Sequence, residues 1–280
     1  MFRIFHGAAL LACATALALP APAKAAFIVF SAAGLTPASI QPTVDAYRNA
    51  LGTLNANVAG SFGSGRREIN WDGVPDGFSA PNNLPGNFFN VNSPRGAVFS
   101  TPGTSFQVSA NAASGTPVEF GNINAGYPSL FAPFSAQRLF TALGSNVTDV
   151  NFFIPGSTTA ALTTGFGAVF SDVDLANVTS IQYFDANGNT LGTLFVPNAT
   201  GDETFSFLGA LSTDGAVISR VRITSGNQVL AAGNTSSDLV VMDDFLYGAP
   251  RRRRRRPRAA HTGHPGAGVR RPRQHTPHAG

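Results

Sequence analysis

Four aspartates, arranged as two pairs, are the residues whose spacing could hold a metal ion. Asp172 and Asp174 close the stretch GFGAVFSDVD, and Asp243 and Asp244 lie inside the stretch VVMDDFLYG. Both stretches are rich in β-forming residues, so successive side chains should point to opposite faces of a strand. Whichever face of the second stretch meets the core, one of its two adjacent carboxylates is then expected to point inward.

A buried carboxylate needs a cation or several hydrogen-bond donors, and the sequence offers two kinds of partner. One is a structural calcium ion, which takes oxygen ligands from aspartate, asparagine and backbone carbonyl groups. The other is an arginine in the same chain, Arg220 or Arg222, whose planar guanidinium can bind a carboxylate through two hydrogen bonds. Both alternatives stay open at the level of sequence.

The stretch GRREINWDG holds the residues best suited to contact a sugar. The Trp71 ring could stack on a sugar face, and Glu68 and Asp72 could accept hydrogen bonds from its hydroxyls. The same pattern also fits a core tryptophan flanked by surface ion pairs, because tryptophan is mostly buried and charged residues are mostly exposed.

The residues that are missing exclude several kinds of catalysis. Residues 26–250 contain no cysteine, histidine or lysine. This excludes Ser-His-Asp and Cys-His nucleophiles, zinc held by histidine or cysteine, and lysine Schiff bases. No acid–base pair is visible either. We therefore expect the chain not to be an enzyme, and a glycoside-active enzyme is the least favoured alternative.

The first 25 residues have the pattern of a secretory signal peptide. A polar start with Arg3 is followed by an apolar run and by Ala23-Lys24-Ala25, which fits a signal-peptidase site. The sequence thus predicts export through the Sec pathway, to the cell surface or the medium. Cys13, in LLAC, is the single cysteine and leaves lipidation open as an alternative. The apolar run is too short for a transmembrane segment.

The mature chain has the periodicity of an all-β protein with one short helix near its start. The stretch 41–52 predicts the helix, with Pro42 at its first position and Gly52 after its end. Short β-rich runs punctuated by Gly and Pro predict strands near 27–31, 67–71, 87–91, 97–100, 105–109, 137–142, 148–154, 165–171, 179–185, 190–196, 203–208, 216–224 and 239–247. We expect one antiparallel, jelly-roll-like β-sandwich over residues 26–248, with a hairpin turn at Asn187-Gly188.

The charges divide the chain into an acidic domain and a basic tail. Residues 26–250 carry seven arginines against fifteen acidic residues, a net charge of −8, whereas residues 251–280 carry ten arginines and no acid. An acidic domain argues against a nucleic-acid partner. We expect residues 249–280 to be a disordered Arg/Pro-rich tail that binds extracellular polysaccharide or another anionic surface polymer. The abrupt change of composition equally fits a frameshift product.

Several stretches of residues 27–248 resemble a group of exported bacterial PEP-CTERM-type proteins of unknown function. They are GRREINWDGVPD, NVNSPRGAVFSTPG, TALGSNVTDVNFFIPG, TGFGAVFSDVD and VVMDDFLYG. The resemblance implies a signal peptide, a β-sandwich and a C-terminal sorting tail. The chain departs from the group at its end, where Pro-Glu-Pro, an apolar span and a basic stop are missing.

The closing DDF is also similar to the last strand of jelly-roll carbohydrate-binding modules. In those modules an aspartate of that strand helps to hold a structural calcium ion, which would point to Asp243 or Asp244. Function does not follow from such a likeness of fold. The sequence favours an exported, non-enzymatic cell-surface or matrix protein with weak glycan binding, and a calcium-stabilised carbohydrate-binding module is the alternative.

Overall fold

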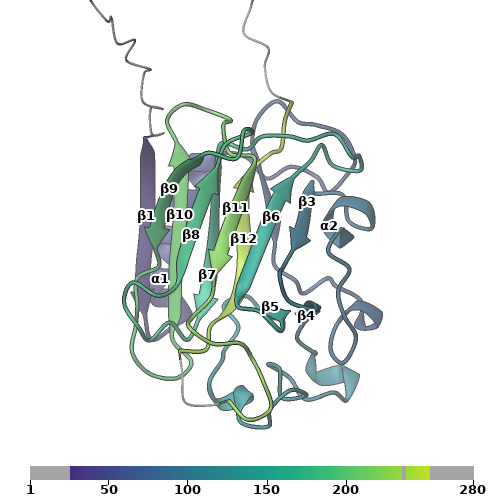
Figure 1. The fold of residues 1–280 in the computed structure, drawn as a ribbon, viewed down its shortest axis with the longest axis vertical. Coiled ribbons are helices and arrows are strands. Elements are labelled where there is room, and N and C mark those ends of the chain that lie inside the picture. Colours follow the sequence, from purple (N-terminus) through teal and green to yellow (C-terminus); the bar gives the residue numbers. More distant parts are fainter. Residues whose placement is uncertain (1–25, 235–237, 253–280) are drawn as a thin grey trace, which may run out of the picture.

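A computed structural model describes residues 26–234 and 238–252 of the chain. These residues form two β-sheets packed face to face, with one N-terminal helix on the outside (Figure 1). All pairings between the named strands are antiparallel. The all-β sandwich with one short N-terminal helix is therefore confirmed. The predicted leader, and residues 253–280 of the predicted tail, lie outside the described residues.

The larger sheet has seven strands, and its central strands carry the longest apolar runs. In spatial order they are β1 (Phe27–Gly34), β10 (Phe205–Ser212), β7 (Gly165–Ser171), β12 (Val241–Gly248), β5 (Phe140–Leu143) and β4 (Ser105–Val108), with β2 (Arg66–Ile69) also paired to β12. Every residue of β7 and β12 is buried. Both faces of these two strands are thus covered, which explains their continuous rather than alternating apolar pattern.

The smaller sheet has five strands and covers one face of the larger sheet. In spatial order they are β3 (Ala97–Ser100), β6 (Val147–Phe152), β11 (Arg220–Thr224), β8 (Ser180–Phe184) and β9 (Thr190–Phe195). In β11, Val221 and Ile223 are buried while Arg220 and Arg222 are half-buried. This alternation is what an antiparallel sheet with one face toward solvent requires.

Aromatic rings fill the space between the two sheets. Trp71 stacks on Phe140 with ring centroids 4.1 Å apart and an interplanar angle of 2°, and it meets Phe245 edge-on at 5.1 Å. Phe99 and Phe166 extend the same cluster on either side. Many of the 23 phenylalanines are therefore structural, since large rings bury much apolar area in a thin layer.

The helix α1 (Pro37–Leu51) packs on the outer face of the larger sheet. It begins four residues before the predicted start, because Pro37 rather than Pro42 occupies its first turn. The buried stripe of the helix consists of Ile40, Val44, Tyr47 and Leu51. The amphipathic face, more than the position of Pro42, sets the helix limits.

Glycines in two strands make the flat surface on which Tyr47 of α1 rests. Gly167 of β7 faces Gly209 of β10 across the ladder, and Gly165 lies two residues away. A Cβ atom on Gly167 would lie 2.9 Å from the Tyr47 ring, and one on Gly165 would lie 2.8 Å from its hydroxyl oxygen. The hydroxyl donates a hydrogen bond to the carbonyl of Ala210 at 3.1 Å. These glycines are needed for the close approach of helix and sheet.

Two local predictions were wrong. The stretch predicted as a strand at 87–91 is a short helix, α2 (Phe88–Val91), which turns the adjacent Phe88 and Phe89 into the core together. The β8–β9 hairpin forms as predicted, but its turn is not the tight Asn-Gly type, in which both central residues have a positive φ. Here Gly188 has a positive φ of 82° and Asn187 does not. The turn is instead held by the Asp185 carboxylate, which accepts from the backbone N–H of Asn187 at 2.8 Å.

Three single-turn 3-10 helices occupy the loops around these strands. They are η1 (Asp76–Phe78), η2 (Ala112–Ser114) and η3 (Tyr127–Ser129). Within the described ranges, none of the helices has the length and apolar character needed to cross a bilayer.

Candidate functional site

The adjacent aspartates of β12 point to the same side of the strand, not to opposite faces. The register of β12 against β7 shifts between Met242 and Phe245, so a bulge lies at Asp243 and Asp244. The Ser135 hydroxyl reaches both carboxylates, at 3.3 Å and 2.8 Å. Both side chains are almost fully buried. The expected alternation therefore fails where the bulge adds a residue to the strand.

Donors surround this pair of carboxylates. Asp243 Oδ2 accepts from the backbone N–H of Phe134 at 2.6 Å and from that of Ser135 at 3.2 Å. Asp244 Oδ2 accepts from Arg48 Nη2 at 2.9 Å. Burial raises the pKa of Asp243 well above its usual range, and the neighbouring Asp244 raises it further. In this arrangement the two carboxylates are already satisfied by protein donors, which a cation would have to displace.

The arginine partner of the pair is Arg48 of α1, and neither Arg220 nor Arg222 takes that place. The two arginines of β11 instead bind Asp149 of β6, at 2.6 Å and 2.7 Å. That ion pair lies on the smaller sheet, where β11 and β6 are neighbours. The correct partner is far away in sequence, so no local spacing could have indicated it.

The second aspartate pair, after β7, forms a separate acidic cluster with Asp238. Asp172 Oδ1 and Asp238 Oδ2 are buried and have no hydrogen-bond partner among the described residues. Asp174 Oδ1 accepts from the backbone N–H of Gly201 at 2.8 Å. Burial raises the pKa of Asp172 to about 8, and nearby carboxylates including Asp202 add to that shift.

Orphaned carboxylate oxygens of this kind are suited to a hard cation. In residues 26–234 and 238–252, however, no group of three or more Asp, Glu, His or Cys side chains is arranged to hold a metal ion. Calcium at Asp172 and Asp174, and at Asp243 and Asp244, therefore stays a prediction.

The three residues predicted to contact a sugar lie in different surroundings. Glu68 is bound by Arg48 Nε at 3.2 Å and by Arg66 Nε at 2.5 Å. Trp71 is 1% exposed, and its indole N–H donates to the carbonyl of Asp243 at 2.9 Å. The sequence allowed two interpretations of this stretch, a sugar-contacting patch or a core tryptophan flanked by ion pairs. The structure has the core tryptophan with ion pairs beside it.

Asp72 lies next to Trp71 and is partly buried. Its carboxylate accepts from the backbone N–H of Arg138 and from the Asn70 amide, both at 3.2 Å. Burial raises its pKa to about 6, mainly because removal of water disfavours the charged form. Asp72 is thus a titratable group near the edge of the core.

A hollow of about 330 Å³ opens beside Trp71, between the loop after β2 and the segment from α2 to β3. It is lined by Asn70, Trp71, Gly73, Val74, Pro75, Phe78, Phe88, Phe89, Asn92, Ser93 and Arg95. Aromatic rings form one wall, and amide, hydroxyl and guanidinium groups lie around them. Neither Glu68 nor Asp72 lines the hollow, and no acidic side chain is among its lining residues.

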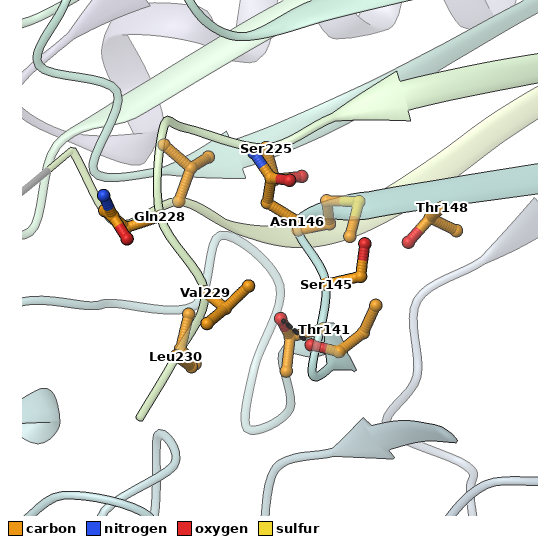
Figure 2. Close-up of a pocket in the computed structure, with 11 residues that line it drawn as sticks. Thr141, Ser145, Asn146, Thr148, Ser225, Gln228, Val229 and Leu230 are labelled. Atoms are coloured by element: carbon orange, nitrogen blue, oxygen red, sulfur yellow. Dashed lines mark hydrogen bonds between the residues drawn. The ribbon is translucent and has the colours of Figure 1, made fainter. Parts of the chain in front are cut away.

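Two other depressions have less to offer a ligand. Figure 2 shows polar side chains, among them Ser145, Thr148 and Ser225, around one depression. This depression has no room for a water molecule. A shallow, open groove of about 480 Å³ runs along the ends of β3 and β4, from Asn83 to Phe106. We therefore take the hollow beside Trp71 as the candidate binding site.

Only part of this hollow was predicted from the sequence. Trp71 was identified as a ligand residue, but Phe78, Asn92 and Arg95 were not. No local signal distinguishes Arg95, because Arg138, Arg220 and Arg222 also lack acidic neighbours in sequence. Only the fold brings 70–78 against 88–95.

Comparison with known proteins gives little more. No protein-family model matches the chain, and no curated protein matches it. A solved structure with some likeness is the enzymatically active domain of Bacteriophage CBA120 tailspike protein 4, with 13% sequence identity and a TM-score of 0.28. The match covers 59% of this chain but only 20% of the tailspike chain.

The prediction that the chain is not an enzyme needs correction. One of its structural neighbours is an enzymatically active domain, so the exclusion of enzymes is wrong as it stood. At a TM-score of 0.28 the likeness carries no argument for a particular activity, substrate or residue.

Proposed function

We propose that this chain is an exported β-sandwich protein that binds carbohydrate in the hollow beside Trp71. The observation that carries the proposal is the combination of aromatic and amide groups around a space of about 330 Å³. Small-molecule sites typically enclose about 300–1,000 Å³ and combine apolar walls with a few polar groups. Export is inferred from the leader, residues 1–25, and places the hollow where polysaccharides are found.

The aromatic wall is suited to the apolar face of a sugar ring. Phe78 is partly exposed and packs on Phe88 with ring centroids 5.2 Å apart, so its position is fixed by a buried neighbour. A ring held in this way offers contact area at low entropic cost. Phe78, rather than the buried Trp71, is the residue we expect to contact the sugar face.

The amide groups are suited to sugar hydroxyls, because each amide both donates and accepts hydrogen bonds. Asn92 is exposed at the end of α2, and its side chain makes no hydrogen bond with the described part of the chain. Asn70 uses one of its N–H groups on Asp72 at 3.2 Å, which leaves its carbonyl oxygen for a ligand. The hollow therefore has hydrogen-bonding groups on two sides.

The test is binding of the full chain to a panel of purified polysaccharides, followed by calorimetry with the best oligosaccharide. Phe78→Ala and Asn92→Ala should each weaken binding at least about tenfold, which corresponds to about 1.4 kcal/mol. Asn187→Ala, in the exposed β8–β9 turn, is the matched control and should bind as the unchanged chain does. If no glycan binds, or if both hollow variants bind normally, the proposal fails.

A further inference from the structure

The arginines of the folded domain are not all neutralised. Residues 26–250 contain seven arginines. Five of them form ion pairs with carboxylates, namely Arg48, Arg66, Arg138, Arg220 and Arg222. Within the described chain, Arg67 and Arg95 have no acidic partner. An unpaired arginine in a domain of net charge −8 needs an explanation, since carboxylates are abundant.

The unpaired Arg67 is explained by its contacts inside the protein. It is fully buried, and its guanidinium donates to the backbone carbonyls of Ala56 and Val58. Its side chain also lies 4.8 Å from the Phe62 ring centroid. Arg67 is thus a structural cation that stabilises the loop after α1. It does not line the hollow.

Arg95 has no such explanation. Its guanidinium lies 5.1 Å from the Phe89 ring centroid and donates through Nη1 to the Ser93 hydroxyl. Its Nε is buried and has no partner among the residues described. The side chain lines the hollow, and its Nη2 makes no hydrogen bond with the described residues.

The surroundings of Arg95 favour an anion. No acidic side chain lines the hollow, so a bound anion meets no like charge there. Burial lowers the pKa of Arg95, which means that its charge is poorly solvated in the free protein. Arg67 is close enough for the two positive charges to repel each other. A negative group in the hollow would relieve both effects.

We infer that the sugar bound in this hollow is anionic, a uronic acid whose carboxylate is held by the Arg95 guanidinium. This inference rests on the proposed carbohydrate-binding function and specifies its ligand class. A guanidinium binds a planar carboxylate through two parallel hydrogen bonds. Arg95 Nη2 has no hydrogen-bond partner among the described residues, so it is available as a donor for such a pair. Phe78 and Asn92 then contact the ring and the hydroxyls of the same sugar.

The test compares two trisaccharides of equal stereochemistry, trigalacturonate and neutral galactotriose, by calorimetry with the full chain. We expect trigalacturonate to bind at least about tenfold more tightly, and Arg95→Gln to remove that preference while keeping the galactotriose affinity. Arg95→Lys should not restore it, because a lysine cannot form the two parallel bonds. Arg222→Gln is the matched control, because it removes one surface arginine from the smaller sheet.

The design separates the possible failures. The arginines of 251–280 are present in every variant, so their attraction for trigalacturonate is the same when two variants are compared with that sugar. If neither trisaccharide nor any other glycan binds, the proposed function itself fails. If both bind equally and Arg95→Gln changes nothing, only the anionic ligand is overturned. Tighter binding of a sulfated trisaccharide than of trigalacturonate would overturn the carboxylate assignment.

A second variant guards against misfolding of Arg95→Gln. Asn92 is exposed, so Asn92→Asp should fold normally and place a negative charge at the hollow. We expect it to weaken trigalacturonate binding at least about fivefold more than galactotriose binding. Equal weakening of both sugars would contradict the inference.

Discussion

At the scale of single residues, the carboxylates of this domain differ mainly in the donors around them. Glu68 and Asp149 are paired with arginines, Asp243 is surrounded by N–H and O–H groups, and Asp172 has a buried oxygen without a partner. Desolvation without a compensating charge raises the pKa of a carboxyl group. The stability of the domain should therefore depend on pH in a residue-specific way.

Asp72 gives a test of this dependence. Its pKa of about 6 in the folded protein exceeds the ordinary value of 3.8, so the folded state holds the proton more tightly than the unfolded state. Its ionisation consequently destabilises the fold as the pH rises from about 4 to 6, and the loss is complete above pH 6. Asp72→Asn should add about 1 kcal/mol to the free energy of unfolding at pH 7. This is less than the full conversion of the pKa shift at ~1.4 kcal/mol per pKa unit, because solvent screens a side chain that is only partly buried.

Urea unfolding at several pH values measures this effect. At pH 4 the variant and the unchanged protein should differ little, because both then carry a neutral side chain at this position. Asp214→Asn, on an exposed turn, is the control. A gain from Asp72→Asn that is as large at pH 4 as at pH 7 would mean that packing, not charge, is responsible.

The acidic cluster after β7 gives a test of metal binding. Because Asp172 and Asp238 have orphaned oxygens, we predict that calcium raises the melting temperature of the domain and that EDTA reverses the rise. Asp172→Asn should abolish the response to calcium, whereas Asp243→Asn should leave it intact, since donors already satisfy that carboxylate. Identical melting curves in calcium and in EDTA would show that protons, rather than a cation, neutralise this cluster.

At the scale of elements, the contact between α1 and the larger sheet depends on glycines. A Cβ on Gly167 would lie 2.7 Å from the Cα of Gly209 and 2.9 Å from the Tyr47 ring. Gly167→Ala should therefore destabilise the domain by about 1–3 kcal/mol, as overpacking of a core does. Gly63→Ala is the control, because a Cβ there meets no atom within 4 Å. Chemical denaturation of both variants measures the difference, and equal stability would contradict the close packing.

How far the sequence predicts the elements depends on how local their causes are. Strands β3 and β7 were predicted with their observed limits, because Phe and Val between Gly, Pro and Ser punctuation indicate a strand locally. The bulge at Asp243 and the helix α2 depend on what packs against them. The Arg48–Asp244 pair joins residues 196 positions apart, so no window of sequence contains its cause.

At the scale of the whole molecule, one side of the sandwich has two open strand edges. In Figure 1 the edge strands β1 and β9 lie on the same side, and the Phe27 ring of β1 is 5.0 Å from Tyr183 in the neighbouring β8. Neither edge strand contains a charged residue. Ile28, Val29 and Phe195 on these edges are 51%, 45% and 50% exposed. Natural edge strands are usually protected by charge, proline or bulges. Strand β9 has a bulge at Leu191, whereas the regular strand β1 has none of these three protections.

We therefore predict that the protein self-associates through this side at high concentration. Val29→Lys places a charge on the edge and should shift the sedimentation profile toward monomer. Val91→Lys, at a residue that is 61% exposed on α2, should not. A monomer at every concentration, or an equal effect of the two lysines, would contradict the prediction.

The domain also contains its own optical reporter. Trp71 is the single tryptophan of the chain, and it lies between the Phe140 ring and the hollow. The tryptophan fluorescence of the protein therefore reports on the surroundings of this one residue. We expect the wavelength and intensity of the Trp71 fluorescence to change both when a sugar binds in the hollow and when the sheets separate. Occupancy and unfolding can thus be followed in the purified, unlabelled protein.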